Sequence, residues 1–557
     1  MIMVSPAEFG GGSLSAASMS PLMRDVSHFI RICPKAGNWS GSVLVSILEE
    51  LLPVKFALSN HNQPALEAEI IVDDPDKNVI GHAYPTVTSL TLPLCARVVT
   101  DEKVVEIDVN FADDPDVPLP FRGRSLRTHV AAEAKPLILV GGEKVLASSE
   151  EGPLWSVSEA NGTKHFRSSL GWPCLPEDGS LISVLNGDRF LELLPIIHFV
   201  RTVCGLSRYE GPPLRACFMF DDPNLHWPRY GFVDFQQIAS HAARENYHVS
   251  FATIPLDAWF THAGTADLFR KNSDWLSLVV HGNNHTHKEL AQNTEQPVRA
   301  SLLLQALRRM ERLEHKSGLN VSRTMVPPHG ACSEAMLEEL PKCGFESATI
   351  SHGSLRAHNQ DRPWTRNLGY HPSEMVQGCP VLPRWGLNGN VQNVILLAAY
   401  LKQPIILRGH HADLRDGLEV LDQLAQFING LGDVLWGNMT KLSRANYEWR
   451  MDGDLLRVIP LGRRLDIRLP QQAARLVVEN SRQNITPCWQ ISASRDSILN
   501  VNVHEPVPLP DETGKTISML AAGKSSPLSE NNSFRPPLWA FLRRLLTEGR
   551  DRMRVVS

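Results

Sequence analysis

The sequence predicts an α/β protein, in which a central segment of alternating strands and helices lies between an α+β domain and a small β-domain. Three observations lead to this prediction. From about 205 to 450, short apolar runs alternate with longer amphipathic stretches. Before this segment the chain shows period-two alternation with hairpin turn signals, and after it short alternating runs separated by turn residues. We therefore divide the chain at about residues 205 and 450.

Composition and charge describe an ordinary globular protein, with 43% hydrophobic and 21% charged residues in a chain of 557. The formal net charge of -5 gives no reason to expect nucleic-acid binding across the whole surface, so no nucleic-acid partner is expected. Nine cysteines, an odd number without a CxxC pair, argue against a disulfide framework or a zinc finger. We find no secretory signal and no apolar run of transmembrane length, and we expect a cytoplasmic protein.

The first part of the chain combines an expected flexible arm with an α+β domain. Residues 1–25 are rich in Gly, Ser, Ala and Met and are assigned to the arm. Within the domain at 26–204, alternation over 104–111 predicts a strand, and Asn161-Gly162 predicts a hairpin turn. A helix is expected over 188–203, broken near Pro195.

The central segment, 205–450, is expected to contain repeated strand-helix units. Strands are predicted at 215–220, 248–254, 275–280, 322–326, 347–351 and 404–408. Helical faces are predicted from Phe235, Ile238, Ala239 and Ala242, from Leu303, Leu307, Met310 and Leu313, and from Leu418, Leu421 and Leu424. Such units imply a parallel sheet, either a barrel or a doubly wound fold. In both folds, function gathers at the carboxyl ends of the strands.

The last part of the chain is expected to form a β-rich domain at 451–530 and a helix at 531–557. The helix is basic and amphipathic, with apolar residues such as Trp539 and Leu542 beside Arg543 and Arg550. It can lie on an acidic membrane surface, but docking onto its own protein is the commoner fate of such a helix.

Polar residues follow five of the six central strands. These residues are Asp221-Asp222 after the first strand, His281 after the third, Pro327–Gly330 after the fourth, His352 after the fifth and Gly409–Asp413 after the last. Because the carboxyl ends of parallel strands meet at one rim, these side chains are expected to form a site.

His281 and His285 are four residues apart, so both imidazoles can reach one ion if the segment turns helically. A carboxylate from Asp221 or Asp222 would complete a three-ligand divalent site, and the other aspartate can act as general base. Taken singly, "DDP" is an ordinary turn and "HGNNHTH" a polar loop. Together with His410-His411 they favour a site.

Residues 215–430 resemble the polysaccharide deacetylases of the NodB-homology type, carbohydrate esterase family four. A strand followed by FDD is matched by Phe220–Asp222, and the HxxxH motif by "HGNNH" at 281–285. "VPPHG" at 326–330 is similar to the third motif, RPPYG, and "IILRGHH" at 405–411 to the last strand and its histidine. The motifs occur in the family's order. The resemblance implies an incomplete (β/α) barrel of the seven-stranded type.

The resemblance also implies a role for each matching residue. Asp221 would be the general base, His410 the general acid with His411 as its rival, and the backbone N–H of His329 the oxyanion contact. The ligands of a divalent metal, zinc by expectation, would be Asp222, His281 and His285. The substrate pocket is expected to include His226, Trp227, Tyr230, Pro328 and Arg408. Its aromatic residues can stack on sugar rings or cap the barrel.

Several positions depart from the family's motifs. Val326 stands where the family has an arginine that orients the catalytic aspartate, and Arg323, Arg408 or Arg366 can substitute for it. Gly282 takes the place of Ser or Thr in the second motif. His329 replaces a tyrosine, and "DRPW" at 361–364 only loosely matches the family's acidic-Trp motif.

The leading hypothesis is a metal-dependent amidohydrolase that acts on a non-peptide C–N bond and removes an acetyl group from an N-acetylated sugar or a related amide. A second hypothesis is a metal- or carbohydrate-binding scaffold with the same fold but no turnover, for which the valine at position 326 is the main support. A third is a metal-dependent nuclease, prompted by "HGNNH". Against the nuclease, this stretch lies inside an array of strand-helix units.

Overall fold

The computed structural model describes long stretches of the chain after residue 103 and short strands before it. The described residues are 2–3, 29–34, 37–38, 56–57, 64–65, 67–73, 88–93, 104–132, 134–160, 163–170, 181–203, 209–365, 367–480, 488–494, 497–509, 516–522 and 538–556. The chain divides into two compact units, Met1–Arg208 with Trp364–Tyr370, and Tyr209–Pro363 with His371–Ser557. The flexible arm predicted for 1–25 lies outside the described residues, apart from the strand β1 (Ile2–Met3).

The first unit is built on a mixed eight-stranded sheet with the order β2-β6-β7-β12-β11-β10-β8-β9. The strands are β2 (Phe29–Pro34), β6 (Glu67–Asp73), β7 (Thr88–Pro93), β8 (Val104–Phe111), β9 (Ser125–Ala131), β10 (Lys144–Ser149), β11 (Gly152–Ala160) and β12 (Thr163–Ser168). The strand predicted at 104–111 is confirmed as β8. Ala160 pairs with Thr163 on either side of the predicted Asn161-Gly162 turn, which lies outside the described residues.

The helix predicted over 188–203 is shorter than expected. It is α2 (Leu194–Val203), and a single 3-10 turn at Phe190–Glu192 precedes it. Pro195 therefore lies in the first turn and does not break the helix. A proline is tolerated there because the first backbone N–H groups of a helix have no partner within it.

The second unit contains a sheet with the order β20-β21-β19-β18-β17-β16-β13-β23-β22. Its strands are β13 (Arg215–Asp221), β16 (Val249–Thr253), β17 (Leu276–His281), β18 (Val321–Val326), β19 (Ser347–Thr349), β20 (Glu374–Val376), β21 (Cys379–Leu382), β22 (Trp385–Gly386) and β23 (Ile405–Gly409). From β21 to β22 all neighbours are parallel, whereas β20 pairs with β21 in the antiparallel sense. All six predicted strands are present, and the short strands β21 and β22 are the members of this parallel run that were not predicted.

The parallel sheet curls into a half-barrel. β21 and β22 lie toward opposite ends of the sheet, yet only Pro383 and Arg384 separate them along the chain. Three residue steps span at most ~11 Å, so the two ends of the sheet must approach each other. No ladder joins β21 to β22 among the residues that the structure describes, and the half-barrel is open at this seam.

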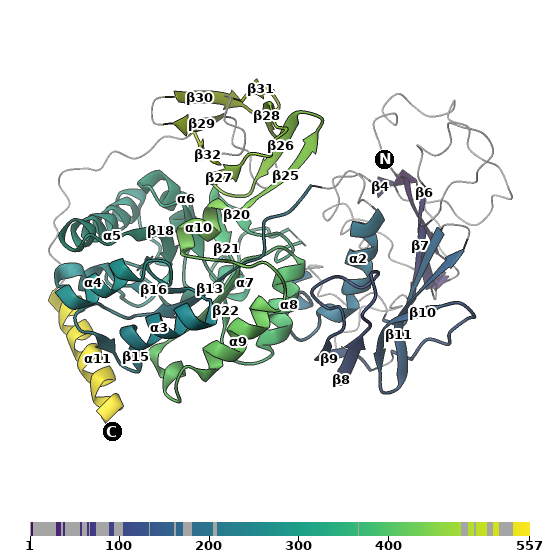
Figure 1. Ribbon diagram of the computed structural model, residues 1–557, viewed down its shortest axis with the longest axis horizontal. Coiled ribbons are helices and arrows are strands. Elements are labelled where there is room, and N and C mark those ends of the chain that lie inside the picture. Colours follow the sequence, from purple (N-terminus) through teal and green to yellow (C-terminus); the bar gives the residue numbers. More distant parts are fainter. Residues whose placement is uncertain are drawn as a thin grey trace. The chain divides into compact units, whose positions relative to one another are not determined.

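Helices cover the outside of this sheet, as Figure 1 shows. They include α3 (Phe235–Glu245), α4 (Ala263–Lys271), α5 (Gln296–Ser317), α6 (Glu334–Cys343), α8 (Val391–Tyr400) and α9 (Glu419–Asn429). The predicted apolar faces of α3 and α5 are confirmed as buried, as are Leu421 and Leu424 of α9. The spacing of the apolar residues thus determines which side of each helix faces the sheet.

The strands after residue 446 form two four-stranded sheets, with the orders β25-β26-β28-β31 and β27-β32-β29-β30. Their strands are β25 (Tyr447–Asp452), β26 (Leu455–Pro460), β27 (Arg464–Arg468), β28 (Arg475–Val478), β29 (Cys488–Ser494), β30 (Ser497–Asn502), β31 (Val507–Pro508) and β32 (Thr516–Ala521). Both sheets contribute to one apolar core that includes Leu456, Leu465 and Trp489. Among the described residues, no helix has the length and apolarity needed to cross a membrane.

Candidate active site

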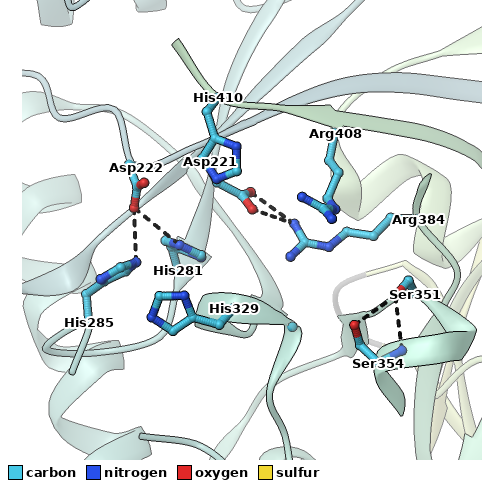
Figure 2. Close-up of a pocket in the computed structure, with 11 residues that line it drawn as sticks. Asp221, Asp222, His281, His285, His329, Ser351, Ser354, Arg384, Arg408 and His410 are labelled. Carbon is cyan, nitrogen blue, oxygen red and sulfur yellow. Dashed lines mark hydrogen bonds and ion pairs between the residues drawn. The ribbon is translucent and has the colours of Figure 1, made fainter. Parts of the chain in front are cut away.

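The polar residues at the strand ends meet in one pocket (Figure 2). β13 ends at Asp221, β17 ends at His281, and β23 ends one residue before His410. The pocket is lined by Asp221, Asp222, His281, His285, His329, Gly330, Ser351, Ser354, Arg384, Arg408 and His410. The structure therefore brings together the six residues predicted as base, ligands, oxyanion contact and first-choice acid.

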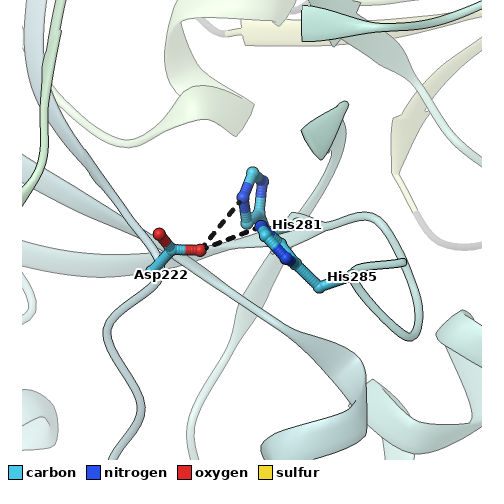
Figure 3. A group of neighbouring side chains, drawn as sticks. All are labelled: Asp222, His281 and His285. Carbon is cyan, nitrogen blue, oxygen red and sulfur yellow. Dashed lines mark ion pairs between the residues drawn. The ribbon is translucent and has the colours of Figure 1, made fainter. Parts of the chain in front are cut away.

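Asp222, His281 and His285 form a cluster in which one ligand atom from each lies within 4.8 Å of the other two (Figure 3). Oδ1 of Asp222 is 3.1 Å from Nε2 of His285 and 3.5 Å from Nε2 of His281. This oxygen is buried, and no described residue gives it a hydrogen bond of good geometry. One carboxylate and two imidazoles are a donor set that zinc accepts.

His281 is oriented by its other ring nitrogen. Nδ1 lies 2.9 Å from the backbone carbonyl oxygen of Val326. A carbonyl only accepts hydrogen bonds, so Nδ1 carries the proton and the neutral ring turns the lone pair of Nε2 toward Asp222. A lone pair facing a carboxylate needs a cation between them, either a metal ion or a second proton on the ring. The residues present therefore fit a divalent metal.

The pKa values of His281 and Asp222 also favour a bound cation. Burial lowers the pKa of His281, but its close contact with the Asp222 carboxylate and the charges of Asp221 and Asp222 outweigh this effect, so the pKa is raised. Burial also opposes ionisation of Asp222, yet the two histidines hold its pKa well below the usual range. Excess negative charge at this point attracts a cation.

The backbone is strained at three of the lining residues. Asp222, His285 and His329 have φ angles of 84°, 54° and 59°, and they are three of eight described non-glycine residues with positive φ. Such conformations cost ~1–3 kcal/mol each and persist only where the surroundings enforce them. Their concentration around one pocket indicates that this geometry is functional.

Glu289 holds the loop that carries His285. Its buried carboxylate accepts backbone N–H groups from Asn283 at 2.7 Å, Asn284 at 3.1 Å and His285 at 3.0 Å. This arrangement accounts for Gly282, which has a φ of +60° and whose added Cβ would lie 2.3 Å from Oε1 of Glu289. The family's hydroxyl at this position is thus replaced by a carboxylate that supports the loop from elsewhere.

Arg384 pairs with Asp221, a contact that the sequence did not predict. Its Nη1 donates to both carboxylate oxygens, at 3.0 and 2.9 Å, and both side chains are almost fully buried. Of the arginines proposed for this role, Arg323 pairs instead with Glu314, and Arg366 lies outside the described residues. Arg408 lines the pocket, but no hydrogen bond from its side chain to Asp221 is present.

Arg384 also determines the charge of Asp221. Burial raises the pKa of this carboxyl, whereas Arg384, His281 and His410 lower it, and the lowering prevails. Asp221 is therefore ionised at neutral pH, as a base must be. Arg384 follows β21 in the segment "VLPRW". Its position after a strand end would have marked it as a candidate site residue, but β21 was not predicted from the sequence.

Of the two histidines after β23, only His410 lines the pocket. The ring of His411 lies 5.9 Å from that of Phe232 and 5.7 Å from that of Tyr230, and its Nε2 is 3.9 Å from Asp551. His352 is buried but does not line the pocket, and burial lowers its pKa to about 4. The neighbouring Ser351 lines the pocket instead of His352.

The expected substrate-pocket residues are only partly brought together, because Arg408 alone of the five lines the pocket. His226 and Tyr230 are buried against the helix α11 (Leu538–Val556), through contacts with Glu548 and Asp551. Trp227 is 55% exposed, and Pro328 is buried in the 3-10 turn after β18. His226 and Tyr230 therefore pack against α11 and do not line the pocket.

The parallel α/β half-barrel thus carries, at its strand ends, an Asp-His-His cluster with the donor set of a metal site and an aspartate paired with an arginine. No family model and no curated protein sequence matches this chain.

Solved structures that are similar to it include carbohydrate deacetylases and esterases. Agd3, described as a carbohydrate deacetylase, is 11% identical, and the match covers 76% of this chain and 82% of Agd3 with a TM-score of 0.39. A family 4 carbohydrate esterase from Streptomyces lividans is 13% identical, with 41% and 94% covered and a TM-score of 0.25. A peptidoglycan N-acetylglucosamine deacetylase from Eubacterium rectale is 13% identical, with 42% and 92% covered and a TM-score of 0.24. Because these TM-scores lie below 0.5, the function proposed below rests on the geometry of the pocket.

Proposed function

We propose that this chain is a metal-dependent deacetylase that hydrolyses the acetamido group of an N-acetylated sugar. The observation that carries the proposal is that two adjacent aspartates face different partners. Asp222 turns toward His281 and His285, while Asp221 turns toward Arg384 (Figure 2). One carboxylate is thereby available to a metal and the next to a proton.

Asp222, His281 and His285 would hold the ion, with zinc as the proposed metal. When bound, the ion would supply a Lewis acid that polarises the acetyl carbonyl. We place the backbone N–H of His329 beside the oxygen on which negative charge develops, since His329 lies on the same rim.

Hydrolysis needs two proton movements, and the pocket offers a group for each. Ionised Asp221 takes a proton from the attacking water, whose oxygen forms the new bond to the acetyl carbon. His410 donates a proton to the sugar nitrogen as the C–N bond breaks, so that acetate and a free amine leave. Arg384 keeps Asp221 ionised and pointed into the pocket.

The alternatives lose their support. The scaffold hypothesis relied on the missing arginine at position 326, and Arg384, in the connection between β21 and β22, makes a contact of that kind with Asp221. The nuclease hypothesis relied on "HGNNH", which lies between β17 and α5 as part of the strand-helix array.

Acetate and amine release from N-acetylglucosamine oligomers tests the proposal. The purified full-length chain is loaded with zinc and compared with the same preparation after chelator treatment. We expect turnover that is lost with the metal and restored by adding it back. An unmodified oligomer after incubation with the metal-loaded protein, whatever the chain length offered, would defeat the proposal.

A further inference from the structure

The helix α11 presents an unusual face to the rest of the unit. Among residues 538–551, its buried positions are Ala540, Arg544, Glu548 and Asp551, a stripe that carries three charges. The apolar residues that make the helix amphipathic are exposed instead, including Trp539 at 71% and Leu546 at 72%. Charged residues are rarely buried unless they are paired, so the partners of this stripe explain why it faces inward.

All three charged residues contact the segment that begins at Asp222. Glu548 accepts from Nδ2 of Asn224 at 3.0 Å and lies 3.2 Å from Nδ1 of His226. Asp551 accepts from the hydroxyl of Tyr230 at 3.3 Å. These contacts bind α11 to the loop between β13 and α3, which carries the first ligand of the proposed metal site.

Arg544 makes the contact nearest to the site. Its Nη2 donates to the backbone carbonyl oxygen of Asp222 at 2.6 Å, and its Nε donates to Oδ2 of Asp257 at 2.8 Å. The side chains of Arg544 and Asp257 are 5% and 3% exposed. A planar guanidinium with two donors held on separate acceptors is a rigid support, and a lysine cannot reproduce it.

The contact falls where the backbone is strained. Asp222 has a φ of 84°, and this turn directs its carboxylate away from the strand and toward the two histidines. Its N–H donates to the carbonyl of Ala252 in β16 at 3.2 Å. The residue is thus held by its N–H from β16 and by its carbonyl from α11.

We propose that Arg544 is a positioning residue of the metal site, which keeps Asp222 in the conformation that a ligand needs. The inference rests on the proposed function, because it requires a metal at Asp222, His281 and His285. It assigns to the last helix of the chain a part in a site that is otherwise built from strand ends more than 250 residues earlier.

The direction of the effect separates positioning from simple electrostatics. Arg544 is a cation near a cation site, so its removal would strengthen metal binding if charge were all that mattered. If Arg544 positions the ligand, removal weakens binding. Groups that orient metal ligands typically contribute ~10-fold to ~100-fold in affinity.

The experiment measures zinc affinity of the full-length protein by competition with a chromophoric chelator. The variants are Arg544→Met, which removes both hydrogen bonds, and Arg544→Lys, which keeps the charge opposite Asp257 but cannot bridge to Asp222. Arg543→Met is the matched control, since Arg543 is on the same helix and its side chain has no hydrogen bond or ion pair with the described residues. The visible spectrum of cobalt-loaded protein reports the coordination geometry of each variant.

We expect zinc affinity to fall ~10-fold to ~100-fold in Arg544→Met and less in Arg544→Lys, with an altered cobalt spectrum in both. Saturating zinc should restore most of the turnover of Arg544→Lys, while Arg543→Met should match the wild type throughout. Equal or tighter zinc binding by both Arg544 variants would overturn the inference and leave the proposed function standing. A wild type that binds no zinc would overturn both. If Arg544→Met does not fold, Arg544→Lys decides the question.

Discussion

Among the groups that keep Asp221 ionised, Arg384 has the largest effect on its pKa, and this effect can be tested by pH. In Arg384→Gln the main group that lowers the pKa of Asp221 is gone, while the burial that raises this pKa stays. The pKa should therefore rise, so that less of the base is ionised at neutral pH. We expect the acidic limb of the pH–rate profile to move to higher pH and the neutral rate to fall, by up to the ~10²–10⁴-fold that a general base contributes.

Arg323→Gln is the control for that variant, because Arg323 pairs with Glu314 and does not line the pocket. It removes the same kind of ion pair without touching Asp221. A profile for Arg384→Gln that coincides with that of Arg323→Gln would show that the buried arginine does not govern the base.

A second residue gives the stability of the fold a defined dependence on pH. His248 is 1% exposed, and its ring nitrogens lie 2.8 Å from the carbonyl of Asp274 and 2.8 Å from the hydroxyl of Ser277. Burial lowers its pKa from 6.5 to about 4. The folded state therefore holds His248 neutral, whereas the unfolded state takes up a proton as the pH falls below 6.5.

This stabilisation is present above pH 6.5 and is lost as the pH falls toward 4. Because one unit of pKa corresponds to ~1.4 kcal/mol, the loss should reach ~3 kcal/mol. We expect the melting temperature of the wild type to fall more steeply over this range than that of His248→Asn, which has nothing to titrate. Parallel curves for the two proteins would contradict the assignment.

At the scale of elements, the loop after β17 depends on a glycine that the family's motif does not have. An alanine at position 282 would carry a Cβ 2.3 Å from Oε1 of Glu289 and 2.6 Å from Pro328, in a backbone conformation with a φ of +60°. Gly282→Ala should displace the carboxylate that holds the loop and destabilise the protein by more than ~1 kcal/mol. We expect bound zinc to be lost with it.

Gly353 supplies the matched control. It lies in the helix α7 (His352–Ala357), and an added Cβ would meet nothing within 4 Å. Gly353→Ala should leave zinc unchanged and raise stability by ~0.5–1 kcal/mol, because alanine favours a helix. The melting temperature and metal content of both variants check the pair. Equal behaviour of the two variants would mean that Gly282 is not constrained by Glu289.

Two elements show why sequence could not predict all of the site. β21 is four residues long and contains Pro380, so it lacked the apolar run by which the other six strands were recognised, and Arg384 was missed with it. The helix α11 has the leucines of an amphipathic helix, and such a pattern predicts that they face inward. The structure buries Arg544, Glu548 and Asp551 instead, since their partners lie in a loop more than 300 residues away in sequence.

At the scale of the whole molecule, the local patterns that repeat along the chain were predictable and the contacts between distant segments were not. Strand and helix periodicity placed six strands and the buried faces of α3 and α5. Because the ends of parallel strands share a rim, the sequence also predicted a common site for Asp221, Asp222, His281 and His410. Which arginine pairs with Asp221, and which of two adjacent histidines enters the pocket, depends on how the sheet curls.

The central claim is that two adjacent aspartates do different work, Asp222 as metal ligand and Asp221 as base. The measurement that tests it most directly compares Asp221→Asn with Asp222→Asn, with zinc content and acetate release determined on the same samples. We predict that Asp221→Asn retains its zinc and loses most of the rate, ~10²–10⁴-fold for a positioned base. Asp222→Asn should lose the zinc itself, and activity with it. Zinc lost from Asp221→Asn but kept by Asp222→Asn would contradict the account.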